Sequence, residues 1–180
     1  MNEKERPAPR IYVADLAAYN AAELRGEWIE LTPDTTVEDL QQAIRALLER
    51  CSRGEYVAEE YAIHDYENFH GYELDEYEHP ETVVKVAAFI AEHGELGAKL
   101  VNQSYDVDEA RGVLEDQYAG CGDSLADWAS EFLEDSGQLA EIPERWRTYI
   151  DFEQYANDLE LGGDVFAIEA EGKVHVFWTR

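Results

Sequence analysis

Histidines beside carboxylates are the residues of this 180-residue chain that could carry out acid–base or metal chemistry. His64 precedes Asp65, a pairing that suits a general base, but it lies in a strand pattern typical of a packed histidine. His64, His70 and His79 could together form a metal site, yet their spacing matches no compact zinc signature. The sequence has no phosphate-binding glycine loop, dinucleotide fingerprint, nucleophile elbow or EF-hand loop. We therefore expect no catalytic residue, no metal and no cofactor.

Carboxylates dominate the chemistry of the chain, with 41 Asp and Glu against 14 Lys and Arg and a formal net charge of −27. Residues 54–84, 112–144 and 148–172 contain no Lys or Arg. A surface of one sign destabilises the folded state by self-repulsion, and solubility is better served by mixed signs. We therefore interpret these stretches as binding a basic partner. The predicted partner-binding carboxylates are Glu55, Glu59, Glu60, Asp65, Glu67, Glu73, Asp75, Glu76, Glu78, Glu81, Glu115, Asp116, Asp123, Asp127, Glu131, Glu134, Asp135, Asp151 and Asp158.

Four of these acids, Asp123, Asp127, Glu131 and Asp135, recur every four residues in a helical pattern. On a helix they would form one stripe that rises about 6 Å per step. Like charges at this spacing destabilise a helix by about 0.2–0.5 kcal/mol per pair. An isolated stripe of this kind is usually a solvated face, but its place within a long base-free stretch favours a function.

A surface this negative repels nucleic acids and anionic membranes, so we expect neither as a partner. Duplex DNA carries one charge per about 1.7 Å of its axis, so 27 charges at that density would cover about 46 Å. A compact chain of this length has a diameter of about 40 Å. One chain thus carries enough charge to imitate a duplex of its own length, which predicts that it binds a DNA-handling enzyme.

Hydrophobic residues make up 45% of the chain and aromatic residues 12%, which predicts a folded core rather than an acidic disordered segment. No apolar run approaches the roughly 18 residues that a membrane span needs. The two cysteines, Cys51 and Cys121, make no disulfide framework, which favours a cytoplasmic location.

The N-terminal part reads as a small α+β unit over residues 1–78. Strands are predicted at residues 10–16, 26–31 and 60–66, and a four-turn helix with a Thr35/Glu38 capping box precedes the third strand. A small helical unit is expected over residues 79–113. Its helix patterns cover 81–92, ended by Gly94, then 95–102 and 106–113.

The last unit, residues 114–180, is again predicted to be α+β. A strand is expected at 114–120, followed by a helix that Asp123 caps and Gly137 ends, with Trp128 and Phe132 inward. Pro143 should open a short helix that carries Trp146 and Ile150, and Phe152 lies in another helix pattern. Residues 164–178 are typical of a hairpin that turns near Gly172. The expected fold class is α+β, with an α+β unit, a helical unit and a second α+β unit in a row.

Three ordered segments resemble the ArdA antirestriction proteins encoded on mobile elements. They are IYVADLAAYNAAELRGEWIEL at 11–31, EEYAIHDYENFHG at 59–71 and EFLEDSGQLAEIPERWRTYIDFEQYANDL at 131–159. The chain departs from the family pattern at Ala21-Ala22, where a Gly is expected after Asn20, and at His70, where a Pro is expected. Both departures affect local loop shape.

The resemblance implies an elongated, curved homodimer that imitates bent B-form DNA, with the last unit forming the dimer. Such proteins occupy the DNA-binding groove of type I restriction-modification enzymes and block restriction, and often modification, without catalysis. The matched aromatic segment places the expected dimer interface around Tyr149, Phe152 and Tyr155.

Two other functions are compatible with the acidity. The chain could be an acidic module for another basic partner, such as a nucleoid or polymerase protein. It could also be an enzyme domain with a salt-adapted surface. Displacement by duplex DNA from a purified type I enzyme would separate the first alternative from DNA mimicry.

Overall fold

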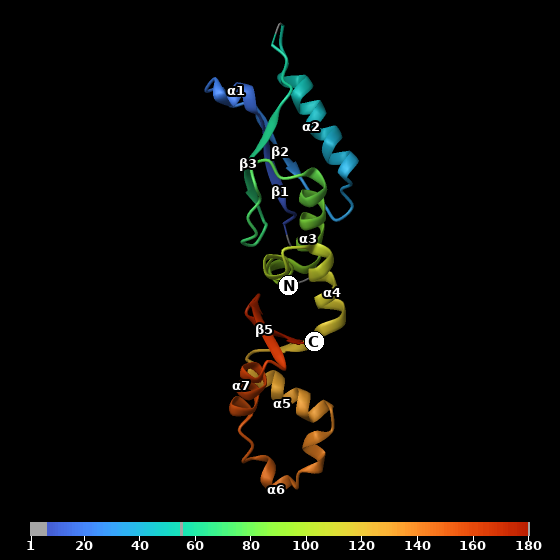
Figure 1. Ribbon diagram of the computed structural model, residues 1–180, viewed down its shortest axis with the longest axis vertical. Helices are drawn as coiled ribbons and strands as arrows, with labels where there is room; N and C mark the ends of the chain where they lie inside the picture. The colour runs from blue at the N-terminus through green and yellow to red at the C-terminus, as the bar shows by residue number, and fades with distance from the viewer. Residues whose placement is uncertain (1–6, 55, 180) are drawn as a thin grey trace. The chain divides into compact units, whose positions relative to one another are not determined.

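The computed structural model describes residues 7–54 and 56–179, and these form seven α-helices, one 3-10 helix and two three-stranded antiparallel sheets (Figure 1). The expected mixture of helices and antiparallel strands is confirmed. By its internal contacts the chain divides into two compact units, residues 1–107 and 108–180. The boundary between them falls inside the stretch 79–113, and the division into three units stays a prediction.

The first unit is built around a sheet in which β1 is the central strand. Its elements are β1 (Arg10–Asp15), α1 (Leu16–Asn20), β2 (Gly26–Glu30), α2 (Val37–Cys51), β3 (Tyr61–Glu67) and α3 (Pro80–Ser104). Each strand lies within one residue of its predicted bounds. β1 pairs antiparallel with both neighbours, so that Tyr12 lies opposite Trp28 on β2 and opposite Asp65 on β3.

Alternation along β1 decides which of its residues enter the core. Ile11 and Val13 are fully buried, whereas Tyr12 between them is only half-buried. Helix α2 buries Leu40, Ile44 and Leu47, one residue per turn, and packs against β1, β2 and α3. Burial of these apolar surfaces is the main force that holds the helix on the sheet.

Helix α3 bends at Gly94, where φ is 60° and ψ is −139°. This backbone conformation is open to glycine at little cost and strains any residue with a Cβ. The sequence pattern that ended one helix at Gly94 and began another at 95 is therefore confirmed as a break, although the two parts follow each other in one continuous run.

The start of α2 corrects the predicted capping box by one residue. Thr36, not Thr35, accepts the N–H of Asp39 at 3.1 Å, and the carboxylate of Asp39 accepts the N–H of Thr36 at 3.0 Å. The hydroxyl of Thr35 instead accepts the N–H of Thr32 at 2.9 Å and closes the preceding turn. The hydrogen bonds from Thr36 hold the pKa of Asp39 below its usual value.

Asp15 is fully buried, and its carboxylate is satisfied by hydrogen bonds. It accepts the N–H of Ala18 at the start of α1, at 3.2 Å, and the phenol of Tyr56 at 2.6 and 2.7 Å. The bond to Asp15 raises the pKa of Tyr56. The helix that Asp15 caps ends at Asn20, and Ala22 just after it has a φ of 63°, a conformation that favours glycine.

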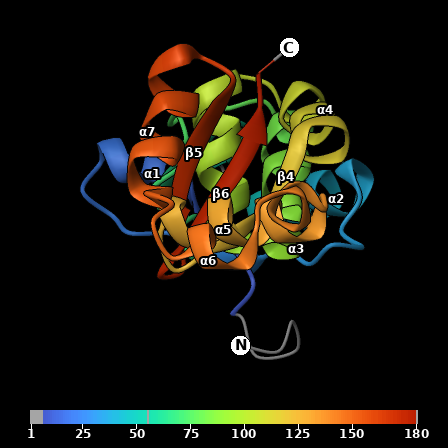
Figure 2. The same ribbon diagram turned by 90° about the horizontal axis from the view of Figure 1, so that it is seen from below.

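The second unit packs two helices against a sheet of strand order β4-β6-β5. Its elements are α4 (Val107–Gln117), β4 (Tyr118–Gly122), α5 (Leu125–Asp135), a 3-10 helix (Gln138–Glu141), α6 (Glu144–Arg147), α7 (Phe152–Gly162), β5 (Val165–Ala170) and β6 (Lys173–Trp178). Figure 2 shows α7 alongside β5. The predicted hairpin is confirmed: Glu171 and Gly172 both have positive φ, as a type I′ turn requires.

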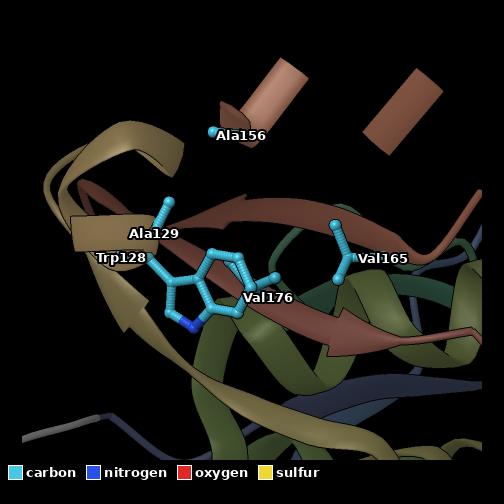
Figure 3. Close-up of a cluster of buried hydrophobic side chains, with 5 residues drawn as sticks. All are labelled: Trp128, Ala129, Ala156, Val165 and Val176. Carbon is cyan, nitrogen blue, oxygen red and sulfur yellow. The ribbon is translucent and has the colours of Figure 1, made fainter. Parts of the chain in front are cut away.

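The core of the second unit lies between α5, α7 and the sheet (Figure 3). Its buried side chains are Trp128, Ala129, Ala156, Val165 and Val176. The Trp128 ring stacks on Phe132 with 5.4 Å between ring centroids. Its indole N–H donates to the carbonyl of Ala119 at 3.0 Å, so that the one polar atom of this core residue is paired.

Three local predictions in this unit are wrong. The strand expected at 114–120 begins only at Tyr118, because residues 114–117 complete α4. Asp123 does not cap α5; the hydroxyl of Ser124 accepts the N–H of Asp127 at 3.1 Å instead. Ile150 lies beyond the end of α6.

Candidate partner-binding surface

The predicted partner-binding carboxylates lie on the surface of the folded units. Glu78 is half-buried, Glu55 lies outside the described residues, and all the others are exposed. The aromatic residues between them, such as Phe69 and Trp128, form the buried cores. The sequence thus separates into an apolar interior and an acidic exterior within each unit.

In the first unit the acids lie just before β3, within β3 and in the segment that leads from β3 into the first turn of α3. Main-chain hydrogen bonds fix two of the carboxylates in this segment. Asp65 accepts the N–H of Tyr66 at 2.8 Å, and Asp75 accepts the N–H of Tyr77 at 2.9 Å. The exposed acids of this surface are Glu59, Glu60, Asp65, Glu67, Glu73, Asp75, Glu76 and Glu81.

Glu67, Glu81 and Asp123 are already paired with cations of the same chain. Glu67 lies 2.6 Å from the guanidinium of Arg10, Glu81 lies 3.3 Å from the Lys85 ammonium, and Asp123 lies 2.5 Å from the Lys173 ammonium. The hydrogen bond from Lys173 lowers the pKa of Asp123. These ion pairs reduce the negative potential that the three acids offer to a partner.

Helix α5 carries four carboxylates and no Lys or Arg. Because Trp128, Ala129 and Leu133 face the core, the polar positions between them face solvent. Asp127, Glu131, Glu134 and Asp135 are all exposed there. Asp123 precedes the helix, so the helix carries three of the four acids of the predicted stripe, namely Asp127, Glu131 and Asp135. Glu134 lies beside them, three residues from Glu131.

The charge density on α5 is close to that of a nucleic acid strand. Residues 127–135 span about 12 Å of helix axis. Four carboxylates over that length give about one charge per 3–4 Å, and one strand of B-DNA has about one phosphate per 3.4 Å.

This arrangement works against the stability of the helix itself. Glu131 has acidic neighbours three and four residues away, and such like-charged pairs are destabilising. Glu134 and Asp135 lie in the last turn of α5, which carries no basic residue. The carbonyl end of a helix is the negative end of its dipole, so acids there are unfavourable.

Helix α7 and helix α4 contribute the remaining predicted acids. Asp151 caps α7 by accepting the N–H of Gln154 at 2.9 Å, and Asp158 accepts the side-chain amide of Gln154 at 2.7 Å. Since α5 and α7 pack against each other, their acids belong to one unit. Glu115 and Asp116 are exposed on α4.

The three residues expected at a dimer interface differ in how they are placed. Tyr149 is 78% exposed and lies beside Trp146, with 6.0 Å between ring centroids. Phe152 and Tyr155 are half-buried, and Tyr155 packs against the core of its own unit. Tyr149 is therefore the residue of the three with the most surface to offer.

The histidines gather no metal-binding group in the part of the chain that the structure describes. Within residues 7–54 and 56–179, no three His, Cys, Asp or Glu side chains come together as a metal site requires. His64 lies in β3 as predicted, and its Nε2 atom is 3.5 Å from a Glu76 carboxylate oxygen. Both cysteines have free thiols, and burial raises the pKa of Cys51. No helix of the described residues has the length and apolar character to cross a membrane.

Sequence reasoning missed one feature, a cavity of about 730 Å³ on the sheet of the first unit. Tyr12, Tyr19 and Trp28 line it together with the acids Asp65 and Glu76. The single aromatic residue in each of the first two strands was the available signal, but strand pairing was needed to bring Tyr12 and Trp28 together.

The family comparison agrees with the pattern of acids and aromatics described above. A model of the family described as antirestriction protein (ArdA) matches residues 11–173. A search of curated proteins found no match to the chain.

Proposed function

Because the chain belongs to the ArdA family of antirestriction proteins, we propose that it occupies the DNA-binding groove of type I restriction-modification enzymes. Exposed carboxylates would take the positions of DNA phosphates there. Restriction of incoming mobile DNA would thereby be blocked. The protein would act in the cytoplasm by binding alone, without catalysis or a cofactor.

The density of unpaired acidic charge on α5 is the observation that carries this proposal. Asp127, Glu131, Glu134 and Asp135 are held on one rigid helix by the Trp128 core, at about the axial spacing of phosphates on a DNA strand. This helix tolerates repulsion that a few basic residues would remove. Binding to a basic groove would offset this repulsion between the acids, and the opposite potentials of the two surfaces would speed association and select the partner.

A cleavage assay tests the proposal. A purified type I enzyme is given unmodified DNA with increasing amounts of the protein. We expect inhibition that duplex DNA relieves by competition and that weakens steeply as salt rises, since salt screens the exposed charges. Normal cleavage in excess of the protein would refute the proposal. Binding to another basic protein, with type I cleavage unchanged, would support the alternative of a general acidic module.

A cell-based assay tests the protection. Unmodified phage is plated on a restricting host with and without the expressed protein, and on a host that lacks the restriction enzyme. We expect the protein to raise plating only on the restricting host. An equal rise on both hosts would point to an effect unrelated to restriction.

We also propose that the protein is a homodimer formed through the second unit, and that the two copies together present one curved acidic surface. Tyr149 is the residue to test, because its 78% exposure allows substitution without disturbing the core. Tyr149→Asp should shift the protein from dimer to monomer in light scattering. Asn157 is exposed on the neighbouring helix, and Asn157→Asp serves as the control because it changes the net charge by the same single negative unit. A wild-type protein that is monomeric at micromolar concentration would contradict this part.

A further inference from the structure

The cavity of about 730 Å³ on the first unit combines aromatic walls with negative charge. Strands β1, β2 and β3, helix α1 and the segment after β3 all supply lining residues. Tyr12, Tyr19 and Trp28 give it aromatic rings, and Asp65 and Glu76 give it carboxylates. Neither Lys nor Arg is among the residues that line it.

Strand pairing builds the aromatic wall. Tyr12 and Trp28 are direct partners across β1 and β2, and their rings meet edge to face with centroids 5.5 Å apart. Gly26 on β2 leaves room for the Tyr12 ring, since a Cβ atom there would lie 2.8 Å from it. Trp28 remains 37% exposed and Tyr19 remains 51% exposed. Part of the surface of both residues is therefore accessible to a ligand.

The two carboxylates lie on the β3 side of the cavity. Asp65 is the β3 partner of Tyr12. Glu76 comes from the segment after β3 and is 3.5 Å from His64, whose ring in turn contacts Tyr19 with 4.1 Å between centroids. Both carboxylates are exposed to solvent, and no Lys or Arg among the lining residues neutralises them.

On the same face of the sheet, an aromatic ring and a carboxylate already bind the guanidinium of Arg10. Arg10 is two residues before Tyr12 on β1, and strand alternation places both on one face. The guanidinium carbon of Arg10 lies 4.6 Å from the centroid of the Trp28 ring, and a guanidinium nitrogen lies 2.6 Å from the Glu67 carboxylate. An aromatic ring and a carboxylate thus grip a guanidinium next to the cavity.

We propose that the cavity receives an arginine side chain of the basic partner, which stacks on the aromatic rings and pairs with Asp65 and Glu76. This inference rests on the proposed function and adds a specific contact to it. Arginine fits better than lysine, because its planar guanidinium stacks on ring faces and binds carboxylates with two parallel hydrogen bonds. Charge complementarity identifies the occupant, because the proposed partner is a groove whose natural ligand is a polyanion, and the cavity has acidic and aromatic walls.

Two substitutions that leave the net charge unchanged distinguish a specific arginine contact from general imitation of DNA charge. Tyr19→Leu removes a ring from the cavity, and Tyr105→Leu removes a more exposed ring elsewhere in the first unit, since Tyr105 is 93% exposed and Tyr19 is 51% exposed. Neither change alters the charge. We expect Tyr19→Leu to inhibit type I cleavage about three- to thirtyfold less well than wild type, and Tyr105→Leu to match wild type. Equal inhibition by both variants and wild type would overturn the proposal.

A direct titration keeps the cavity testable by itself. The full chain is titrated with N-acetyl-arginine methylamide, and the four Trp indole N–H signals are followed by NMR. We expect the Trp28 signal to shift with the arginine probe and not with its neutral citrulline analogue. No shift, or an equal shift with citrulline, would refute the arginine site even if restriction is inhibited. A protein that fails to inhibit restriction but shows the selective shift would instead refute the proposed function alone.

Discussion

Neutralising the exposed acids of α5 should weaken inhibition and stabilise the protein at the same time. The variant combines Glu131→Gln, Glu134→Gln and Asp135→Asn, all exposed positions that form no part of the core. Gln and Asn keep the size and polarity of the side chains. If the acids had a purely structural role, the variant would lose stability. A gain or a loss in the free energy of unfolding therefore distinguishes a binding role from a structural role.

The stability gain has two sources. The variant removes like-charge repulsion within α5 from three pairs, each worth about 0.2–0.5 kcal/mol: Asp127 with Glu131, Glu131 with Glu134, and Glu131 with Asp135. Two acids also leave the last turn, where each opposes the helix dipole by about 0.3–1 kcal/mol. The free energy of unfolding should therefore rise by about 1–3 kcal/mol, and Tm by about 2–4 °C for each kcal/mol. Calorimetry measures this change.

The affinity loss follows from the ion pairs that the enzyme can no longer form. Exposed pairs are worth about 0.2–1 kcal/mol each, so three of them correspond to an affinity about three- to 150-fold lower. The difference should shrink as salt rises, because screening weakens the pairs that wild type still makes. Inhibition of type I cleavage at two or more salt concentrations measures it.

A matched control separates local geometry from net charge. Glu67→Gln, Glu81→Gln and Asp123→Asn change the net charge by the same three units, from −27 to −24, but these acids are already paired with Arg10, Lys85 and Lys173. We expect the control to inhibit nearly as well as wild type. If both triple variants lose the same affinity, only total charge matters, and the argument from the α5 surface is refuted.

Three further changes test the fold. Trp128→Ala should lower the free energy of unfolding of the second unit by about 3–5 kcal/mol in urea, because it empties the core centre, and Trp128→Phe should cost less. Ala22→Gly should raise stability by up to about 1 kcal/mol in the same assay, since Ala22 has a φ of 63°; a loss would show that the conformation costs nothing there. The pKa of Asp39 is lowered by Thr36, so its contribution is present above the usual carboxyl value of 3.8 and lost as pH falls through the lowered pKa. Wild type and Asp39→Asn should thus differ in urea stability at pH 6 and converge at low pH.

Local signals in the sequence were sufficient for most of the elements. Alternating Ile, Tyr and Val near Ile11 predicted β1, and apolar residues spaced as in α2 predicted that helix. The turn at Gly172 predicted the hairpin, and the break at Gly94 was marked by the glycine itself. These features depend on backbone conformation and on which side chains cannot face water, and both act over a few residues.

Predictions that depended on choosing between neighbouring residues were less accurate. Thr35 and Thr36 have the same side chain, and a turn with Thr32 decided which one caps α2. Asp123 and Ser124 are both good caps, and the distant Lys173 took Asp123 as its partner. In each case another hydrogen bond decided which residue caps the helix, and the spacing of capping residues does not indicate that bond.

The sequence by itself determined the acidity, the segregation of its charges and the family, because composition, order and motifs need no fold. Tertiary structure alone decided which carboxylates keep their charge unpaired: Arg10 meets Glu67 across β1 and β3, and Lys173 meets Asp123 across the second unit. It also brought Tyr12, Tyr19 and Trp28 around one cavity. Contacts between residues far apart in the chain form only when strands pair and helices pack, since burial of the apolar faces fixes which surfaces meet.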